Sequence, residues 1–258
     1  MKSLIKYIGV LLLIMFSFYY ADNISKALIY KSELMKQILH EKDKHETDYI
    51  NAIITDEYII PGMNGIKVNE IDSYYNMKKI NSFSVNKLIY DQIIPEVSLE
   101  NNKKYLINKG NPNKKAISIV LDDTNKYLIN YAIKNNIKIN VLTTYHNFDK
   151  NLKAKQINAD DENYDKLESL LNRNQLNTNI YFVKNQKKST KDKYLVTYTY
   201  IVTNNTLPNI KINYGDIIYI DNNLSLANFK ILIKKIQYNN YNIIYLDELI
   251  SEENNNYK

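Results

Sequence analysis

The sequence contains no cysteine among its 258 residues. Disulfide bonds, thiolate nucleophiles and cysteine–zinc sites are therefore excluded, while the redox compartment stays open. Glycine and proline are also scarce, with five and four residues respectively. Such a low glycine content leaves no glycine-rich loop of the kind that cradles phosphate groups.

Arginine is nearly missing as well, because Arg173 is the only one in the chain. Lysine therefore supplies almost all of the positive charge behind the formal net charge of +6. Nucleic-acid readers favour arginine for bidentate contacts, and no basic block interleaved with aromatic residues occurs. We expect no nucleic-acid partner. The charge suits a surface that faces anionic lipid or a cell-wall polymer, or it serves no specific partner.

The clearest positive feature is the N-terminus. Lys2 and Lys6 precede the uncharged run YIGVLLLIMFSFYY, which extends over 14 residues from Tyr7 to Tyr20. This order is typical of a signal peptide, and the run is shorter than the roughly 20 residues of a full membrane span. Tyr19, however, stands where a small side chain belongs ahead of a cut after Ala21.

The aromatic end of this run favours a membrane interface over a cleavage site. We predict that residues 1–21 form an uncleaved anchor, a single N-terminal span in the cell membrane with the bulk of the chain on the extracytoplasmic side. A cleaved signal peptide, which would release a secreted protein, is the alternative. A buried helix of a soluble protein is a third possibility.

Four further segments follow the anchor. Residues 22–46 are polar, with apolar positions at helical spacing, and predict a helical stalk. Residues 47–110 predict a small β-rich leader module with strands at 49–54, 58–60, 87–94 and 96–99 and a helical turn at 74–79. The dipeptide Asn64-Gly65 is a strong hairpin signal within it. Residues 113–251 form the main domain, and residues 252–258 a polar tail that we expect to be disordered.

The main domain alternates between strand and helix patterns. After a first strand at 116–121, strands are predicted at 137–143, 179–183, 194–202, 217–220 and 242–246, and helices at 125–135, 161–172, 226–237 and 247–251. Such alternation indicates an α/β domain with a largely parallel sheet.

Two adjacent carboxylates end the first of these strands. The stretch AISIVLDDTN runs from residue 116 to residue 125, and its apolar part predicts a strand buried on both faces. Asp122 and Asp123 then fall at the carboxyl end, where ligand-binding and catalytic side chains gather in α/β folds. The alternative is structural: Asp123 or Thr124 caps the helix that follows.

Several of these segments resemble the polysaccharide deacetylase (NodB-homology) family. The similar parts are KAISIVLDDTN with the following YAIKNNIKINVLT, the closing GDIIYID and FKILIKKIQYNNYNIIYLDEL, and the leader IIPGMNGIKVN. The chain is similar to a divergent membrane-anchored bacterial member. The resemblance implies an α/β fold, namely a deacetylase-like partial (β/α) barrel preceded by a small β-rich module and an N-terminal membrane-anchor or stalk helix.

The resemblance also implies metal-assisted hydrolysis of N-acetylated sugars. Asp122 would be the general base, and Asp123 would bind zinc together with two histidines spaced H-x3-H. That histidine motif is missing here. His146 follows the second strand alone, with Lys150 four residues further on, and Thr124 replaces the glycine that follows the aspartate pair in the family.

Other metal ligands are few. His40 and His45 belong to the stalk, and Asp160 and Asp161 form a second pair whose position at a helix start favours capping. His146 fits a surface loop better than a ligand. Catalytic zinc normally has three protein ligands. An aspartate base alone gives roughly 10²- to 10⁴-fold acceleration, which is too little for an unactivated amide.

We therefore hypothesise a catalytically degenerate cell-envelope protein, a pseudoenzyme that acts as a carbohydrate-binding or scaffolding module without a cofactor. Asp122 and Asp123 would be vestiges of the base and the ligand. The first alternative is an active zinc-dependent carbohydrate N-deacetylase with an unconventional ligand set. The second is a membrane-tethered interaction protein whose stalk or leader module does the binding.

Overall fold

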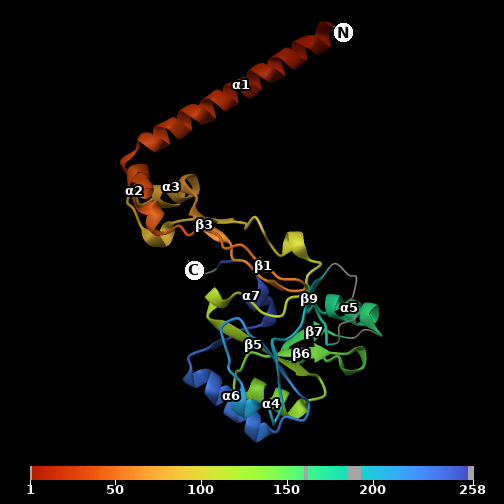
Figure 1. The fold of residues 1–258 in the computed structure, drawn as a ribbon. Coiled ribbons are helices and arrows are strands. Elements are labelled where there is room, and N and C mark those ends of the chain that lie inside the picture. The colour runs from red at the N-terminus through yellow and green to blue at the C-terminus, as the bar shows by residue number, and fades with distance from the viewer. Residues whose placement is uncertain (1, 160–161, 185–192, 255–258) are drawn as a thin grey trace. The chain divides into compact units, whose positions relative to one another are not determined.

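The computed structural model describes residues 2–159, 162–184 and 193–254. The chain divides into two compact units (Figure 1). The first consists of Met1–Asp48 with Gly65–Ile93, and the second of Tyr49–Asn64 with Ile94–Lys258. The chain therefore enters the second unit, returns to the first and enters the second again.

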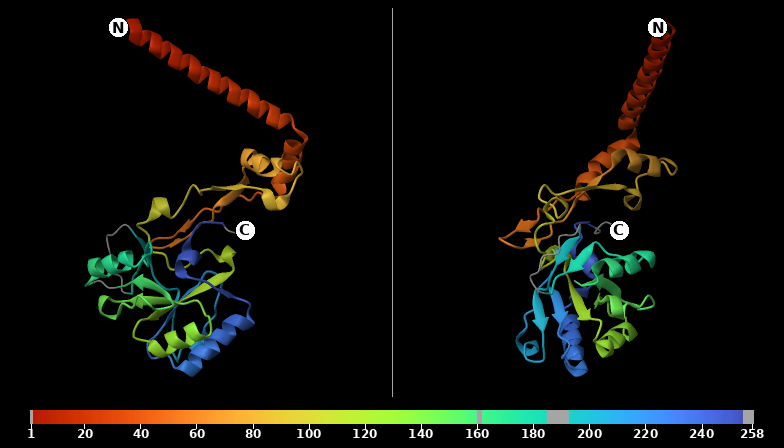
Figure 2. Two further views of the ribbon diagram at one scale, coloured as in Figure 1. Left: turned by 180° about the vertical axis from the view of Figure 1, so that it is seen from behind. Right: turned by 90° about the vertical axis from the view of Figure 1, so that its right-hand side faces the viewer.

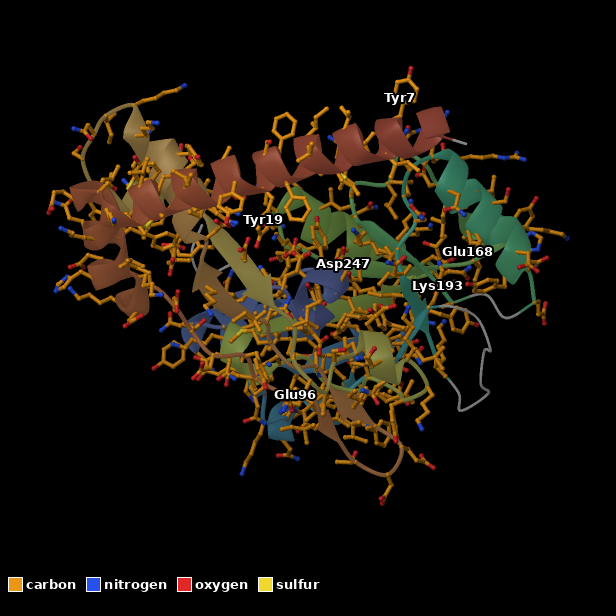
Figure 3. The ribbon with its side chains drawn as sticks, turned by 90° about the horizontal axis from the view of Figure 1, so that it is seen from above. Tyr7, Tyr19, Glu96, Glu168, Lys193 and Asp247 are labelled. Carbon is orange, nitrogen blue, oxygen red and sulfur yellow. The ribbon has the colours of Figure 1, made fainter. Side chains whose placement is uncertain are left out.

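The first unit begins with helix α1 (Lys2–Lys31), which carries the apolar N-terminal run and continues into the predicted stalk. Its side chains from Tyr7 onward are almost all exposed, and Figure 3 shows Tyr7 and Tyr19 projecting from the helix. A second helix, α2 (Glu33–Glu41), begins after Ser32. Ser32 is its N-cap, because the Ser32 Oγ accepts a hydrogen bond from the backbone N–H of Met35 at 3.2 Å. The predicted stalk is thus helical but broken at this cap.

Within the first unit, α2 packs on α3 (Glu70–Lys78) and on a two-stranded antiparallel sheet of β3 (Gly65–Val68) and β4 (Tyr90–Ile93). Met35, Ile38 and Met77 are fully buried between them. Two 3₁₀ turns, η1 (Lys42–Lys44) and η2 (Val85–Lys87), complete this unit. The predicted helical turn at 74–79 is the second half of α3.

The hairpin predicted at Asn64-Gly65 is wrong. Gly65 opens β3 and pairs with Ile93 of β4, and neither Asn64 nor Gly65 has the positive φ that a two-residue hairpin turn requires. The tight hairpin lies a few residues earlier, between β1 (Ile53–Ile54) and β2 (Ile59–Ile60). The strand predicted at 96–99 does not form; the chain turns there into η3 (Glu100–Asn102).

The second unit contains an eight-stranded sheet in which the strands pair in parallel. Its strands are β5 (Ala116–Asp122), β6 (Asn140–Thr143), β7 (Lys155–Asn158), β8 (Ile180–Phe182), β9 (Tyr194–Val196), β10 (Tyr200–Val202), β11 (Ile217–Ile220) and β12 (Asn242–Ile243). They are arranged in the order β10-β11-β5-β6-β7-β8-β9, with β12 on the first residues of β5.

One extended segment joins the two ends of this row. Its first part, β9, pairs with β8. Its second part, β10, begins after three intervening residues and pairs with β11. The sheet therefore curls into a partial barrel (Figure 2). The predicted α/β fold class is confirmed: a parallel partial barrel with a long apolar N-terminal helix and small antiparallel sheets.

Helices cover the outside of the barrel, and apolar side chains fill its inside. Alternate residues of β5, including Ile117, Ile119 and Leu121, pack outward against α4 (Lys126–Lys134) and α6 (Leu226–Tyr238). Val120 faces inward with apolar residues of β6, β7, β8 and β11. Because strand side chains alternate between faces, Asp122 also points inward. Helices α5 (Tyr164–Arg173) and α7 (Leu246–Ile250) complete the unit, with 3₁₀ turns η4 (Pro112–Lys114), η5 (Tyr145–Asn147) and η6 (Leu207–Asn209).

Candidate functional site

The structure places the aspartate pair where the sequence predicted it. Asp122 is the last residue of β5 and Asp123 follows it, and both residues are buried, with 5% and 4% of the whole-residue surface exposed. Buried carboxylates need hydrogen-bonding or charged partners, so the identity of these partners decides what the pair can do.

The partners of Asp122 come from two other strand ends. Lys184, two residues beyond β8, donates from Nζ to Oδ1, and the Tyr219 hydroxyl on β11 donates to Oδ2. Burial and the adjacent Asp122 carboxylate raise the pKa of Tyr219, so its hydroxyl stays protonated and keeps donating. Both oxygens of Asp122 are therefore occupied, one of them by a positive charge.

An aromatic wall supports this contact. The ring of Tyr198 stacks on that of Tyr219 with 5.6 Å between centroids, and Phe182 lies 6.1 Å from Tyr219. These rings keep the phenol in place and hold water away from the carboxylate side that it covers. The ammonium of Lys184 reaches Asp122 from the rim, since 38% of its side chain is exposed.

Asp123 serves the neighbouring strand. Its Oδ2 accepts hydrogen bonds from the backbone N–H and the Oγ1 of Thr144, both at 2.8 Å, which ties the end of β5 to the end of β6. The capping alternative is wrong for α4: its first turn, within the described residues, has no side-chain cap, and the cap position is Asn125.

His146 lies in η5, two residues after Thr144, and is exposed. Its ring makes an edge-on contact with Tyr145 at 5.5 Å between centroids. His40 and His45 belong to the first unit, where His40 Nδ1 contacts Glu41 at 2.9 Å. Asp160 and Asp161 lie outside the described residues.

These residues do not fit a catalytic zinc site. Within residues 2–159, 162–184 and 193–254, no group of three or more histidine, aspartate, glutamate or cysteine side chains is placed to hold a metal ion. A divalent ion at Asp122 would also have to displace the Lys184 ammonium from the carboxylate. The strand ends present instead a carboxylate that is paired with an ammonium and hydrogen-bonded by a phenol.

No pattern in the sequence pointed to Lys184 or Tyr219. They lie 62 and 97 residues from Asp122 along the chain, so no local motif joins them. The available signal was topological, because strands of a parallel sheet end at one edge and side chains at those ends converge. Lys184 directly follows the strand sequence IYFV, and Tyr219 is the third residue of IIYI.

At the level of sequence, similarity to a known protein covers about a third of the chain. No family model matches the chain. A stretch of 92 residues is 36% identical to the uncharacterized protein YlxY of Bacillus subtilis (strain 168), and it covers 35% of this chain and 29% of that protein.

Among solved structures, BA3943, a CE4 family pseudoenzyme from Bacillus anthracis, is similar with a TM-score of 0.56 and 17% identity, over 86% of this chain and 96% of that one. A BA3943 mutant, described as a CE4 family pseudoenzyme with restored enzymatic activity, gives a TM-score of 0.55 at the same identity, over 86% of this chain and 99% of that one. The chain thus has the fold of the CE4 polysaccharide deacetylases, which confirms the predicted resemblance at the level of the fold.

Proposed function

We propose that this protein is a pseudoenzyme with the CE4 fold, which acts at the cell envelope as a carbohydrate-binding or scaffolding module. The observation that carries the proposal is the pairing of Asp122 with the Lys184 ammonium and the Tyr219 hydroxyl. Asp122 is the vestige of a general base, and Asp123, bound to Thr144, is the vestige of a metal ligand.

The chemistry of amide hydrolysis supports the loss of activity. A metal ion contributes several kcal/mol by polarising the carbonyl and lowering the pKa of the attacking water. Without a ligand set for such an ion, the remaining general base would supply roughly 10²- to 10⁴-fold at best. The Lys184 ammonium and the Tyr219 hydroxyl each donate to one oxygen of Asp122, so both compete with a water molecule for the oxygens that a general base would use.

The similarity to BA3943 is consistent with this proposal. That protein is described as a CE4 family pseudoenzyme, and a mutant of it as one with restored enzymatic activity. The CE4 fold thus occurs in a protein described as a pseudoenzyme, and mutation restored enzymatic activity to that protein.

The cell-envelope location rests on α1. Tyr7–Lys31 is long and apolar enough to cross a membrane by length and composition, and its apolar window is not buried. A signal sequence would have the same character. We propose an uncleaved anchor that holds the barrel on the extracytoplasmic side, where cell-wall glycan is the available polymer.

Zinc content and acetate release test the proposal together. The full chain in detergent, equilibrated with zinc and then dialysed, is expected to retain far less than one zinc per chain and to release no acetate from N-acetylated cell-wall glycan. It is expected to sediment with the same insoluble glycan. One zinc per chain that is lost in Asp123→Ala, together with acetate release, would establish the active deacetylase instead.

Failure to sediment with glycan, with zinc and acetate results as expected, would point to a different role. The protein would then be a membrane-tethered interaction protein, and its stalk or leader module would be the part to test for partners.

A further inference from the structure

The net positive charge of the chain is concentrated in two segments of the second unit. Residues 124–148 and 222–246 contain six lysines and no aspartate or glutamate. When these six are taken from the 34 lysine and arginine residues, the remaining 28 equal the 28 acidic residues. The two segments therefore account for the whole formal net charge of +6, and each carries one outer helix of the barrel, α4 or α6.

The two helices lie side by side on the outside of the barrel (Figures 1 and 2). Their inner faces share one apolar cluster. The Lys230 ammonium of α6 lies over the ring of Tyr131 of α4, 5.1 Å from its centroid, and the same ring makes an edge contact with Phe229 at 6.1 Å. The outward sides of α4 and α6 therefore form one surface.

This surface combines exposed lysines with exposed aromatic and apolar side chains. Lys230 and Lys234 are one helical turn apart, and Lys126 and Lys134 two turns, so each pair shares one side of its helix. The most exposed rings are 84% and 88% accessible, and an isoleucine between them in the sequence is 54% accessible. We call this surface the α4–α6 face, and it consists of Lys126, Tyr127, Lys134, Lys230, Ile231, Lys234 and Tyr238.

The four lysines of the face make no ion pair with any described residue. The carboxylates that are nearest along the chain have other roles or other neighbours. Asp123 is bound to Thr144, and Asp221, ahead of α6, accepts a hydrogen bond from the backbone N–H of Asn223 at 2.8 Å. Asp149 shares its turn with Lys150 and Lys153, so that turn adds no net negative charge.

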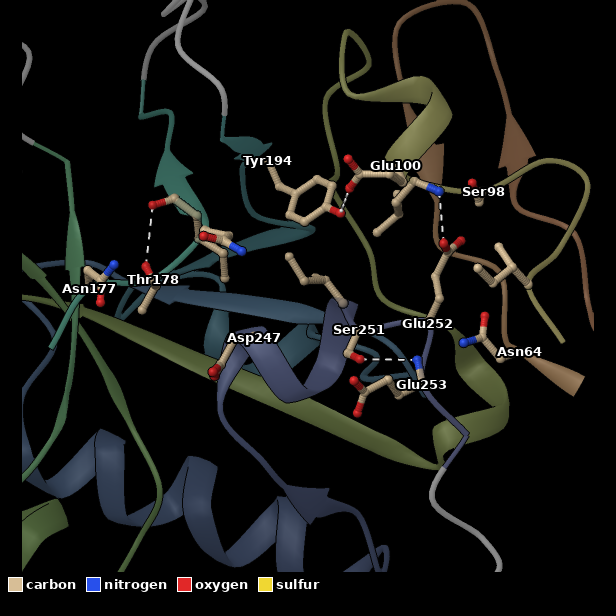
Figure 4. Close-up of a pocket in the computed structure, with 15 residues that line it drawn as sticks. Asn64, Ser98, Glu100, Asn177, Thr178, Tyr194, Asp247, Ser251, Glu252 and Glu253 are labelled. Atoms are coloured by element: carbon tan, nitrogen blue, oxygen red, sulfur yellow. Dashed lines mark hydrogen bonds between the residues drawn. The ribbon is translucent and has the colours of Figure 1, made fainter. Parts of the chain in front are cut away.

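Acidic residues of the same unit that gather elsewhere are compensated by lysines. The carboxylates that line a pocket at the start of β8 and β9 (Figure 4) are Glu100, Asp247, Glu252 and Glu253. Lys103 pairs with Glu100 at 2.6 Å and Lys155 with Asp247 at 2.8 Å, while Lys114 interacts electrostatically with Glu252 and Glu253. The uncompensated charge of the unit thus lies on the α4–α6 face, which favours an anionic partner.

The position and spread of the lysines narrow the choice of partner. Within the second unit, the segments that connect to the first unit join the inner apolar cluster with α7, and none of them contributes to the cluster under α4 and α6. Lys126 and Lys134 are roughly 12 Å apart along the axis of α4, at about 1.5 Å per residue. Charges spread in this way suit a partner with repeated anionic groups, and lysine binds phosphate as a point charge.

We propose that the α4–α6 face binds a linear envelope polymer in which polyol units are joined by phosphodiesters. The four ammonium groups contact successive phosphates, the Tyr127 and Tyr238 hydroxyls donate to polyol oxygens, and Ile231 contacts the carbon backbone. The choice of a polyol phosphate over a nucleic acid rests on the extracytoplasmic location proposed above, while the face and its preference for a polyanion do not.

Calorimetry with the full chain tests this inference. The chain is held by α1 in a nanodisc of neutral phosphatidylcholine and is titrated with polyglycerol phosphate, or with dextran as an uncharged polymer. We expect the phosphate polymer alone to bind, with an affinity that falls as salt is added because exposed charges are screened. Lys230→Gln with Lys234→Gln is expected to weaken binding about three- to tenfold, and Lys126→Gln with Lys134→Gln to act in the same direction.

The matched control removes the same charge from another part of the second unit. Lys103→Gln with Lys166→Gln changes two lysines outside the α4–α6 face, near η3 and on α5. Its affinity for the polymer is expected to stay within about twofold of the wild type. Equal weakening by the control pair and by Lys230→Gln with Lys234→Gln would show attraction by net charge alone and would overturn the inference.

Three other outcomes also overturn it. The first is no binding of polyglycerol phosphate at low salt. The second is attachment of the nanodiscs to phosphatidylglycerol vesicles without binding of the polymer, which would assign the face to anionic lipid. The third is binding of duplex DNA but not of the polymer, which would also contradict the extracytoplasmic location. Zinc content, acetate release and sedimentation with N-acetylated glycan do not depend on these lysines, so they test the proposed function separately.

Discussion

Lys184 and Asp122 form a pair of unequal exposure. The carboxylate is 7% exposed, while the lysine side chain is 38% exposed and supplies the charge from the rim. An exposed pair contributes little to stability, whereas removal of one partner from a buried pair leaves an uncompensated charge. This pair lies between those limits, so its contribution is measurable but moderate.

We expect Lys184→Met to lower the free energy of unfolding by about 1–3 kcal/mol at pH 7, because Asp122 then keeps only the Tyr219 hydroxyl. Urea unfolding of the full chain in detergent, followed by near-ultraviolet circular dichroism of the tyrosines, measures the change. The double variant with Asp122→Asn should recover most of the loss.

The matched control for this prediction is Lys138→Met. Lys138 pairs with Glu248 at 3.1 Å, and both side chains are 45% exposed. Its removal is expected to change stability by less than about 1 kcal/mol. Equal losses in Lys184→Met and Lys138→Met would contradict the view that Asp122 needs the ammonium.

Lys114 is a second residue whose surroundings set its chemistry. Burial lowers its pKa to about 8, against the opposing effect of Glu253, Glu248 and Glu252. Its Nζ donates to the carbonyl of Glu248 at 2.5 Å, a contact that tolerates a neutral amine.

The lowered pKa of Lys114 gives a signed pH dependence. The unfolded chain holds the proton up to about pH 10.5, while the folded chain releases it near pH 8. The free energy of unfolding of the wild type, minus that of Lys114→Gln, is therefore expected to rise as the pH increases from about 8 to 10.5. The gain is lost as the pH falls back through 8. Denaturation of both proteins from pH 7 to 10.5 measures it; a flat difference would contradict the lowered pKa.

At the scale of elements, Asn140 joins three parts of the barrel. Its Nδ2 donates to Ser118 Oγ at 2.8 Å and to the Ile119 carbonyl at 2.9 Å, both on β5. Its Oδ1 accepts from the backbone N–H of Leu246, the first residue of α7, at 3.0 Å. Asn140 is fully buried, so water cannot replace any of these partners.

We expect Asn140→Ala to lower the free energy of unfolding by about 2–4 kcal/mol, because it strands the Leu246 N–H and removes the cross-strand bonds. Asn135→Ala removes an exposed amide that bonds to the Tyr131 carbonyl at the end of α4 and should cost below about 1 kcal/mol. Hydrogen exchange at Leu246 should accelerate in Asn140→Ala and stay unchanged in Asn135→Ala.

The same scale shows what the sequence could predict. Strand β11 and helix α6 were placed within one residue, because a continuous apolar run and a 3.6-residue period are local signals. Strand β7 was missed because its buried positions include Gln156 and Asn158, whose amides bond to Asp149, Thr143 and Glu168. A polar strand has no apolar pattern, and its partners are set by the tertiary fold.

The candidate site was likewise predictable only where the signal in the sequence is local. The two aspartates were visible at the end of β5, whereas Lys184 and Tyr219 were not, because their contact depends on the order of strands in the curled sheet. That order follows from the segment that carries both β9 and β10, which a sequence pattern shows only as one strand at 194–202. Likewise, Glu168 on α5 pairs with Lys193 ahead of β9, as Figure 3 indicates, without any local motif.

At the scale of the whole molecule, the proposed membrane location rests on α1. It has no acidic residue before Asp22, and its exposed apolar side chains have no protein partner to cover them within the described residues. Bilayer lipid is the environment that stabilises such a surface. The alternative, removal of the segment as a signal peptide, would give a shorter mature chain.

We expect the double change Leu12→Arg with Met15→Arg to release the protein from membranes, because each arginine near a span centre costs about 2.5–3.5 kcal/mol and two cost about 5–7 kcal/mol. Alkaline extraction of membranes from producing cells should leave the wild type in the pellet and the variant in the supernatant. Leu12→Ile with Met15→Leu, which keeps the apolar character, should stay in the pellet. Mass spectrometry of the wild type should find the intact N-terminal segment; a mature chain that begins after Ala21 would show that α1 is a signal peptide and that the barrel acts as a secreted protein.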